Sequence, residues 1–115
     1  MLYNELLANR IREAIADSGE IEEKKMFGGL CFMVNGKMCI CVRADEMMCR
    51  VGPDEYEAAL EKPDTRPMLH NAKSMKGYVF VNKEAIKANK DFDYWINASL
   101  KFNNYAKAVK PKKKK

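Results

Sequence analysis

Residues 24–42, KKMFGGLCFMVNGKMCICV, decide how this chain folds, because short apolar runs alternate there with turn residues. The pair Asn35-Gly36 is a strong hairpin signal, since both central positions of a type I′ turn need positive φ. The runs on either side therefore predict two antiparallel strands. A second tight connection at RADEM, residues 43–47, predicts a third strand that ends near Val51.

Helical patterns flank this β region. Near the N-terminus, apolar residues recur at helical spacing: Leu2, Leu6, Leu7, Ile11, Ala14 and Ile15. GPDEYEAALEKP, residues 52–63, predicts a short helix with proline at its start and acidic residues in its first turn, where the helix dipole favours them. From Asp91 onward a broad apolar stripe predicts a last helix: Phe92, Trp95, Ile96, Ser99, Phe102, Tyr105, Ala106 and Val109.

A second hairpin is predicted between these two later helices. It would comprise a short strand near Met68, a turn at NAKS, residues 71–74, and the strand MKGYVFV, residues 75–81. Asn82 can cap the segment that follows. The order helix, three strands, helix, two strands, helix predicts an α+β domain with helices packed on an antiparallel sheet.

The length of 115 residues allows one domain with one core. No run of about 18 apolar residues is present to span a membrane. The N-terminal segment carries frequent charges and lacks the apolar region of a signal peptide. We therefore expect a cytoplasmic protein whose cysteines are reduced.

The formal net charge of +5 belongs to the C-terminal end of the chain. Five lysines stand in the last six residues, KPKKKK: Lys110, Lys112, Lys113, Lys114 and Lys115. Because the whole chain has 21 basic and 16 acidic residues, the remainder is balanced. We expect residues 110–115 to form a disordered tail that either aids solubility or binds nucleic-acid phosphates with strong salt dependence.

Two-residue loops at Asn35-Gly36 and Ala44-Asp45 would fix which residues share a face of the sheet, because side chains alternate along a strand. One face is apolar throughout and is predicted to be the core: Cys31, Met33, Met38, Ile40, Val42, Met47, Cys49 and Val51. The other face mixes apolar and charged residues: Leu30, Phe32, Val34, Lys37, Cys39, Cys41, Arg43, Met48 and Arg50.

This register favours structural cysteines over a metal or redox role. An all-cysteine zinc site needs four converging sulfurs, whereas the predicted faces hold two cysteines each and no CxxC turn exists. Cys31 and Cys49 would lie two strands apart, and Cys39 and Cys41 would be neighbours along one strand, so neither pair suits a disulfide. A three-residue second loop would instead place Cys41 opposite Cys49. We expect no metal and no cofactor.

Catalytic chemistry has little support in the sequence. Gly28-Gly29 is followed by a strand rather than a helix, which indicates a bulge or a close backbone approach and not a phosphate loop. The single histidine, His70, lies in the turn-rich stretch MLHNAKS, and no local signature pairs it with Cys39 or Cys41. We predict no enzymatic activity, and a small-ligand binder or an enzyme of unknown reaction is the last alternative.

Several stretches together resemble the N-terminal domain of the TfoX/Sxy family: KKMFGGLCFMVNGKMC, RVGPDEYEAALEKPDTRPM, MKGYVFV and the tryptophan of the last helix, Trp95. The resemblance covers nearly the whole chain, so residues 1–109 are predicted to form one such domain. It implies the element order α-β-β-β-α-β-β-α, which resembles the fold of type III secretion chaperones. Known members regulate natural competence with the cyclic-AMP receptor protein, and their second, helical domain has no counterpart in this sequence.

We therefore expect a small regulatory or adaptor protein with a role in transcription regulation. It would act by contact with a protein partner or with a second copy of itself. The mixed face of the sheet is the predicted contact surface, because an apolar strip rimmed by charge is typical of protein interfaces. Arginines at its edge suit acidic partners. The residues predicted to form this surface are Phe32, Val34, Lys37, Arg43, Met48 and Arg50. The alternative is nucleic-acid association through the lysine tail.

Overall fold

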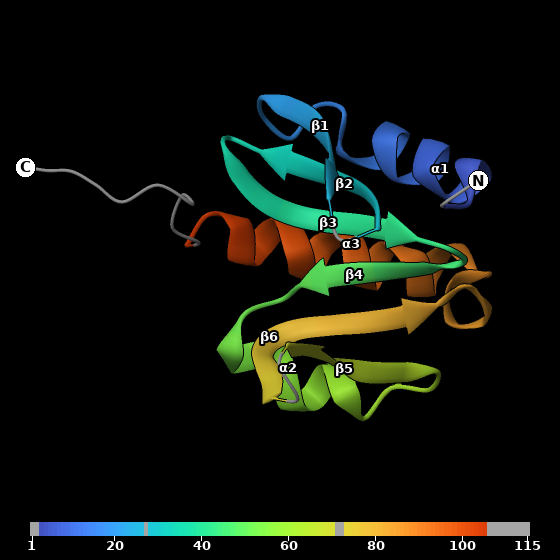
Figure 1. The fold of residues 1–115 in the computed structure, drawn as a ribbon, viewed down its shortest axis with the longest axis vertical. Helices are drawn as coiled ribbons and strands as arrows, with labels where there is room; N and C mark the ends of the chain where they lie inside the picture. The colour runs from blue at the N-terminus through green and yellow to red at the C-terminus, as the bar shows by residue number, and fades with distance from the viewer. Residues whose placement is uncertain (1–2, 27, 71–72, 106–115) are drawn as a thin grey trace, which may run out of the picture.

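The computed structural model describes residues 3–26, 28–70 and 73–105 and confirms an α+β fold. Six strands form one sheet in the order β1-β2-β3-β4-β6-β5, and every neighbouring pair is antiparallel (Figure 1). The elements in chain order are α1 (Glu5–Ile15), β1 (Ile21–Met26), β2 (Gly29–Val34), β3 (Lys37–Arg43), β4 (Glu46–Arg50), α2 (Pro53–Leu60), β5 (Thr65–His70), β6 (Lys73–Asn82), the 3-10 helix η1 (Lys83–Ile86) and α3 (Asn89–Asn103). Strand β1 is an addition to the predicted order.

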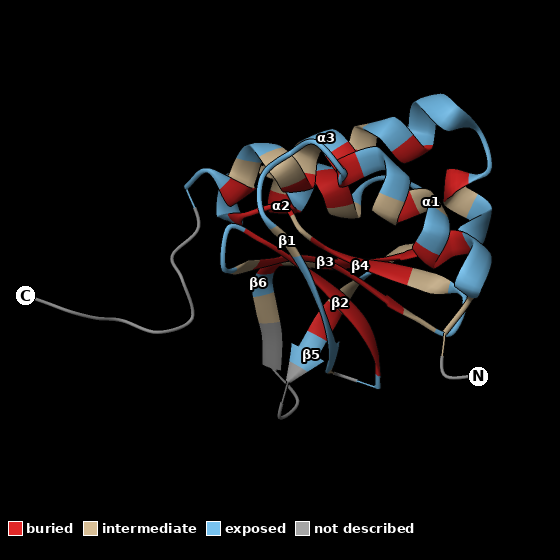
Figure 2. Cartoon of the chain, turned by 90° about the horizontal axis from the view of Figure 1, so that it is seen from above, coloured by how far each residue is buried: buried red, intermediate tan, exposed pale blue. Residues whose placement is uncertain are grey.

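The helices α1, α2 and α3 lie on one face of the sheet, as Figure 2 shows. We call this the helix-covered face and the opposite one the open face. Between the helices and the sheet lies the main core, whose largest fully buried side chains include Trp95, Phe32, Ile40 and Ile11. A second, smaller apolar cluster lies on the open face. The sheet therefore has apolar side chains buried on both faces.

The predicted turn chemistry is confirmed in the first hairpin. Asn35 and Gly36 have φ angles of 55° and 79°, the positive values that a type I′ turn needs. Gly29 lies in close contact with the backbone of β3: a Cβ at this position would be 2.1 Å from the carbonyl oxygen of Val42. The predicted close backbone approach at Gly28-Gly29 is thus found at Gly29.

Side-chain caps define the starts of two helical segments. The Asn4 side chain accepts a hydrogen bond of 3.1 Å from the backbone N–H of Leu7 and caps α1. The Asn82 side chain accepts one of 3.0 Å from the backbone N–H of Glu84, which confirms the predicted cap. Pro53 is the first residue of α2, where its missing N–H costs no intrahelical bond.

The hairpin formed by β3 and β4 has the predicted register. Val42 pairs with Met47, Cys41 with Met48, and Ile40 with Cys49. The first hairpin, β2–β3, departs from the prediction because it contains a β-bulge. Met33 pairs with Met38, but Phe32 pairs with Ile40, so Cys39 is an extra residue on β3. Cys39 and Ile40 both belong to the main core.

The bulge makes the predicted face assignment of β2 wrong. A shift of one residue in pairing moves every side chain beyond it to the opposite face. Leu30, Phe32 and Val34 therefore lie in the main core under the helices. By contrast, Cys31, Met33 and Met38, predicted as core residues beside Ile40, lie in the smaller cluster on the open face.

Some predictions fall outside the described residues. These are the centre of the turn at 71–72, the predicted end of the last helix at 106–109 and the lysine tail at 110–115. In the part of the chain that the structure does describe, no helix is long and apolar enough to cross a membrane.

Candidate functional site

On the open face, side chains of paired residues form rows that run across the strands. The central row runs through Cys31 on β2, Cys41 on β3, Met48 on β4, Phe80 on β6 and Arg66 on β5, each paired with the next. On one side of this row, Arg43 of β3 is paired with Glu46 of β4. On the other side, Arg50 of β4 is paired with Tyr78 of β6. Three strands, β3, β4 and β5, thus each contribute an arginine to one face.

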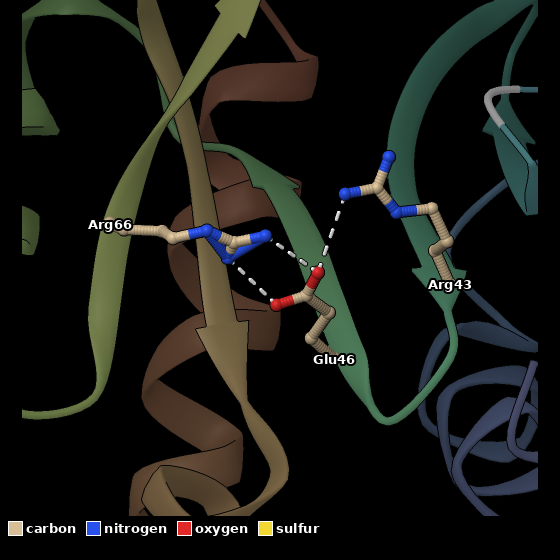
Figure 3. Close-up of polar contacts among 3 residues, drawn as sticks. All are labelled: Arg43, Glu46 and Arg66. Atoms are coloured by element: carbon tan, nitrogen blue, oxygen red, sulfur yellow. Dashed lines mark hydrogen bonds and ion pairs between the residues drawn. The ribbon is translucent and has the colours of Figure 1, made fainter.

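Glu46 links two of these arginines, as Figure 3 shows. Its carboxylate accepts two hydrogen bonds of 2.9 Å from the two Nη atoms of Arg66, a bidentate pair. The same carboxylate accepts a longer contact of 3.5 Å from Arg43 Nη2. The Glu46 side chain is only 15% exposed, whereas those of Arg43 and Arg66 are 41% and 50% exposed. Bidentate geometry fixes the guanidinium plane as well as its position.

The guanidinium groups of all three arginines lie against aromatic rings. The guanidinium carbons of Arg43 and Arg66 lie 4.6 and 4.5 Å from the centroid of the buried Phe80 ring. The guanidinium of Arg50 lies 5.5 Å from the Tyr78 ring and donates a hydrogen bond of 3.3 Å to the carbonyl oxygen of Met38. Cation–π contacts of this kind stabilise a guanidinium while its edge stays available to another ligand.

We call this surface the arginine face and define it by Arg43, Glu46, Arg50, Arg66, Tyr78 and Phe80. One carboxylate stands among three guanidinium groups, so the surface is positively charged. Each guanidinium carries five N–H donors, and Glu46 occupies only two of those of Arg66. The arrangement can therefore bind carboxylate or phosphate groups of a partner through donors that are already oriented.

The residues predicted as a contact surface are divided by the structure. Arg43, Met48 and Arg50 lie on the open face, as their pairing shows. Phe32 and Val34 are 0% and 1% exposed in the main core, on the opposite face. Lys37 is half-buried at the hairpin end, paired with Val34. The prediction of an exposed apolar strip of Phe32, Val34 and Met48 is wrong, because the bulge moves two of them under the helices and Met48 is 2% exposed.

Four residues of the arginine face were missed by sequence reasoning: Glu46, Arg66, Tyr78 and Phe80. Arg66 was missed because the strand was predicted only near Met68, and Pro67 stands between the two residues. The structure makes this segment the edge strand β5, and an edge strand tolerates Pro67 because one side of it needs no hydrogen-bond donor. The signal available in the sequence was the spacing of Arg66 and Met68 on either side of Pro67, because side chains two residues apart share one face of a strand.

The cysteines differ from their prediction. Cys31 and Cys41 lie directly opposite each other with a Cα–Cα distance of 4.0 Å and form a disulfide. The expectation that all four cysteines are reduced is therefore wrong, again because the bulge changes which residues of β2 and β3 share a face. Cys39 and Cys49 are buried free thiols, and burial raises the pKa of each to about 12. Neither is activated as a nucleophile at neutral pH.

The structure does not assemble the alternative site of Cys39, Cys41 and His70. Cys39 lies in the main core, while Cys41 is bonded to Cys31 on the open face. The side chain of His70 is outside the described part of the chain. Among the described residues, no group of three or more His, Cys, Asp and Glu side chains is arranged to hold a metal ion.

These features define a small α+β domain with a six-stranded antiparallel sheet, helices on one face and a positively charged surface on the other. The family model described as the TfoX N-terminal domain matches residues 13–103. The chain therefore belongs to the TfoX N-terminal domain family, as the resemblance of its motifs predicted. No curated protein matches the sequence.

Proposed function

We propose that this protein is a small cytoplasmic regulatory or adaptor protein without enzymatic activity, which acts by contact with another protein through its arginine face. The observation that carries the proposal is the position of three arginines, from β3, β4 and β5, on one face of the sheet, each lying over an aromatic ring. Pre-oriented side chains lose less conformational entropy when a partner binds. Membership of the TfoX family supports a role in transcription regulation.

The charge of the arginine face favours an acidic partner over a second copy of the same surface. A symmetric dimer would bring two positively charged patches together, and like charges placed against each other oppose association. An acidic segment would instead meet guanidinium groups that match carboxylates in a bidentate fashion. We therefore propose a heterologous protein partner with an acidic contact segment, and a homodimer as the competing outcome.

Replacing two arginines tests this proposal. Arg43→Gln/Arg66→Gln removes two positive charges of the arginine face while keeping polar side chains of similar length. Proteins captured from the native cytosol by the wild type should be absent from the captures of this variant, because the matched donors and their charge are lost. Quantitative mass spectrometry of the captured proteins measures the difference, and analytical ultracentrifugation shows whether the chain associates with itself.

Arg12→Gln is the matched control. Arg12 also forms an ion pair, with Glu23, and lies 5.7 Å from the Phe32 ring, but it extends from α1 on the helix-covered side. Its replacement should leave the captured set unchanged. Capture of the same proteins by the wild type and the double variant would rule out the arginine face as the contact surface.

The lysine tail supports a second candidate function, association with nucleic acid. Five lysines within six residues form a concentrated positive charge, and binding through phosphates weakens steeply as salt rises. Retention of the intact protein on DNA at low salt should therefore be lost after deletion of residues 110–115. Equal retention of the two forms at every salt concentration would exclude this use of the tail.

A further inference from the structure

Sulfur is distributed unequally between the two apolar clusters of this protein. On the open face, all but one of the seven buried residues of the cluster carry sulfur: Cys31, Met33, Met38, Cys41, Met48 and Met68, with Phe80 the exception. Met26 and Met75 pack against this cluster from its edge. The main core has 21 buried residues in the described part of the chain, and sulfur occurs there only at Cys39, Met47 and Cys49.

Packing alone gives no reason for this separation. Methionine fills irregular gaps well because its side chain is flexible, but that property would serve the helix-covered face equally. Flexible thioethers placed around two cysteines have another property in common, which is affinity for soft metal ions. The open-face cluster therefore has the ligand chemistry of a soft-metal site.

The strand register brings three of these sulfur-bearing residues together. Cys31 pairs with Cys41, and Cys41 pairs with Met48, so they are consecutive members of one row on β2, β3 and β4. Neighbouring strands in a sheet are about 4.7–4.9 Å apart, a spacing that a methionine side chain spans. Met33 pairs with Met38 next to this row. Met33 is two residues from Cys31 on β2, and Met38 is three residues from Cys41 on β3.

We propose that the reduced protein binds one Cu(I) ion on the open face, through the sulfur atoms of Cys31 and Cys41 and the thioether of Met48. Met26 and Met75, which are only partly buried at the edge of the cluster, provide the route by which the ion enters. This site is independent of the proposed partner contact, although it shares the open face with it.

The proposal requires that the Cys31–Cys41 bond is reduced first. Two low-molecular-weight thiols supply the two electrons and leave as their own disulfide, and the protein gains two thiols. Cu(I) then displaces the thiol protons and keeps its oxidation state. The oxidised protein, in which these sulfurs are bonded to each other, does not bind the ion in this way.

The ligand types discriminate between metals. Zinc sites are built from Cys, His and carboxylate ligands, and the described residues offer no group of three such side chains. Soft thiolate and thioether donors together favour Cu(I). The competing thiol pair, Cys39 and Cys49, lies in the main core without a methionine row beside it.

The test is an anaerobic titration of the reduced full-length chain with Cu(I) against a chromophoric Cu(I) chelator. We expect one ion per chain, and no stoichiometric binding of Zn²⁺. Cys31→Ala/Cys41→Ala should abolish binding. Met48→Leu keeps the size and apolar character of the side chain and should weaken binding by at least about tenfold, a loss that even outer-shell changes at metal sites can cause.

Met47→Leu is the matched control, because Met47 neighbours Met48 in sequence but faces the main core. It should bind Cu(I) as tightly as the wild type. Circular dichroism of each reduced variant confirms that it is folded before titration. Binding that survives in Cys31→Ala/Cys41→Ala, or equal affinities of Met48→Leu and Met47→Leu, would overturn the proposed ligand set.

Discussion

Ile40→Ala is expected to lower the free energy of unfolding by about 2–5 kcal/mol, the usual cost of truncating a buried branched residue. Ile40 is 0% exposed and lies on β3 in the main core, between the sheet and the helices. Its removal leaves a cavity that rigid neighbours on both β2 and β4 cannot fill. Denaturant unfolding followed by the fluorescence of Trp95, the single tryptophan, measures the loss.

Leu6→Ala serves as the control for Ile40→Ala. Leu6 is 80% exposed on α1, so its truncation should change the free energy of unfolding by less than about 0.5 kcal/mol. A similarly small loss for Ile40→Ala would mean that the side chain does not lie in the core. The assignment of the helix-covered face would then be wrong.

Reduction of the Cys31–Cys41 disulfide is expected to lower the free energy of unfolding by about 3 kcal/mol, because the bond restricts the unfolded chain. The two cysteines are 10 residues apart in sequence, which makes the restricted loop short. Small domains are typically stable by about 5–15 kcal/mol, so the reduced protein should stay folded. Unfolding curves with and without reductant measure the difference.

Two variants separate this effect from other effects of the reductant. Cys31→Ala/Cys41→Ala should unfold at the same denaturant concentration whether or not reductant is present. Cys49→Ala should keep the full response, because Cys49 is a free thiol in the main core. A response to reductant that disappears in Cys49→Ala would indicate a different disulfide partner.

Much of the fold could be predicted from local sequence signals. Asn35-Gly36 requires a tight turn with positive φ, and this requirement fixed the position of the first hairpin. The loop at Ala44-Asp45 gave the correct register for β3 and β4. Strand β1 was not predicted because its charged sequence, IEEKKM, lacks an apolar alternation. Charges of this kind suit an edge strand, where they discourage pairing with other chains.

The bulge could not be predicted, because its flanking residues fit either face. Cys39, Ile40 and Cys41 are all apolar or weakly polar, so no charged side chain identifies which of them is the extra one. Register is strongly specified only where a slip would bury polar groups. A single extra residue at Cys39 then exchanged the faces of Phe32 and Cys31.

The candidate site was predicted only in part for the same reason. Arg43 and Arg50 were assigned to the correct face because they belong to the hairpin whose register was right. Phe32 and Val34 were assigned to the wrong face because they lie beyond the bulge. Arg66 and Phe80 come from β5 and β6, and their position on the open face depends on the long-range pairing of β4 with β6 and of β6 with β5, which no local pattern reports.

The bulge at Cys39 is the central claim on which the sulfur cluster and the burial of Phe32 in the main core depend. Peptide mapping of the unreduced protein, alkylated after denaturation, tests it most directly. We predict one disulfide that joins Cys31 to Cys41, with alkylated thiols at Cys39 and Cys49. A disulfide between Cys41 and Cys49 would contradict the register.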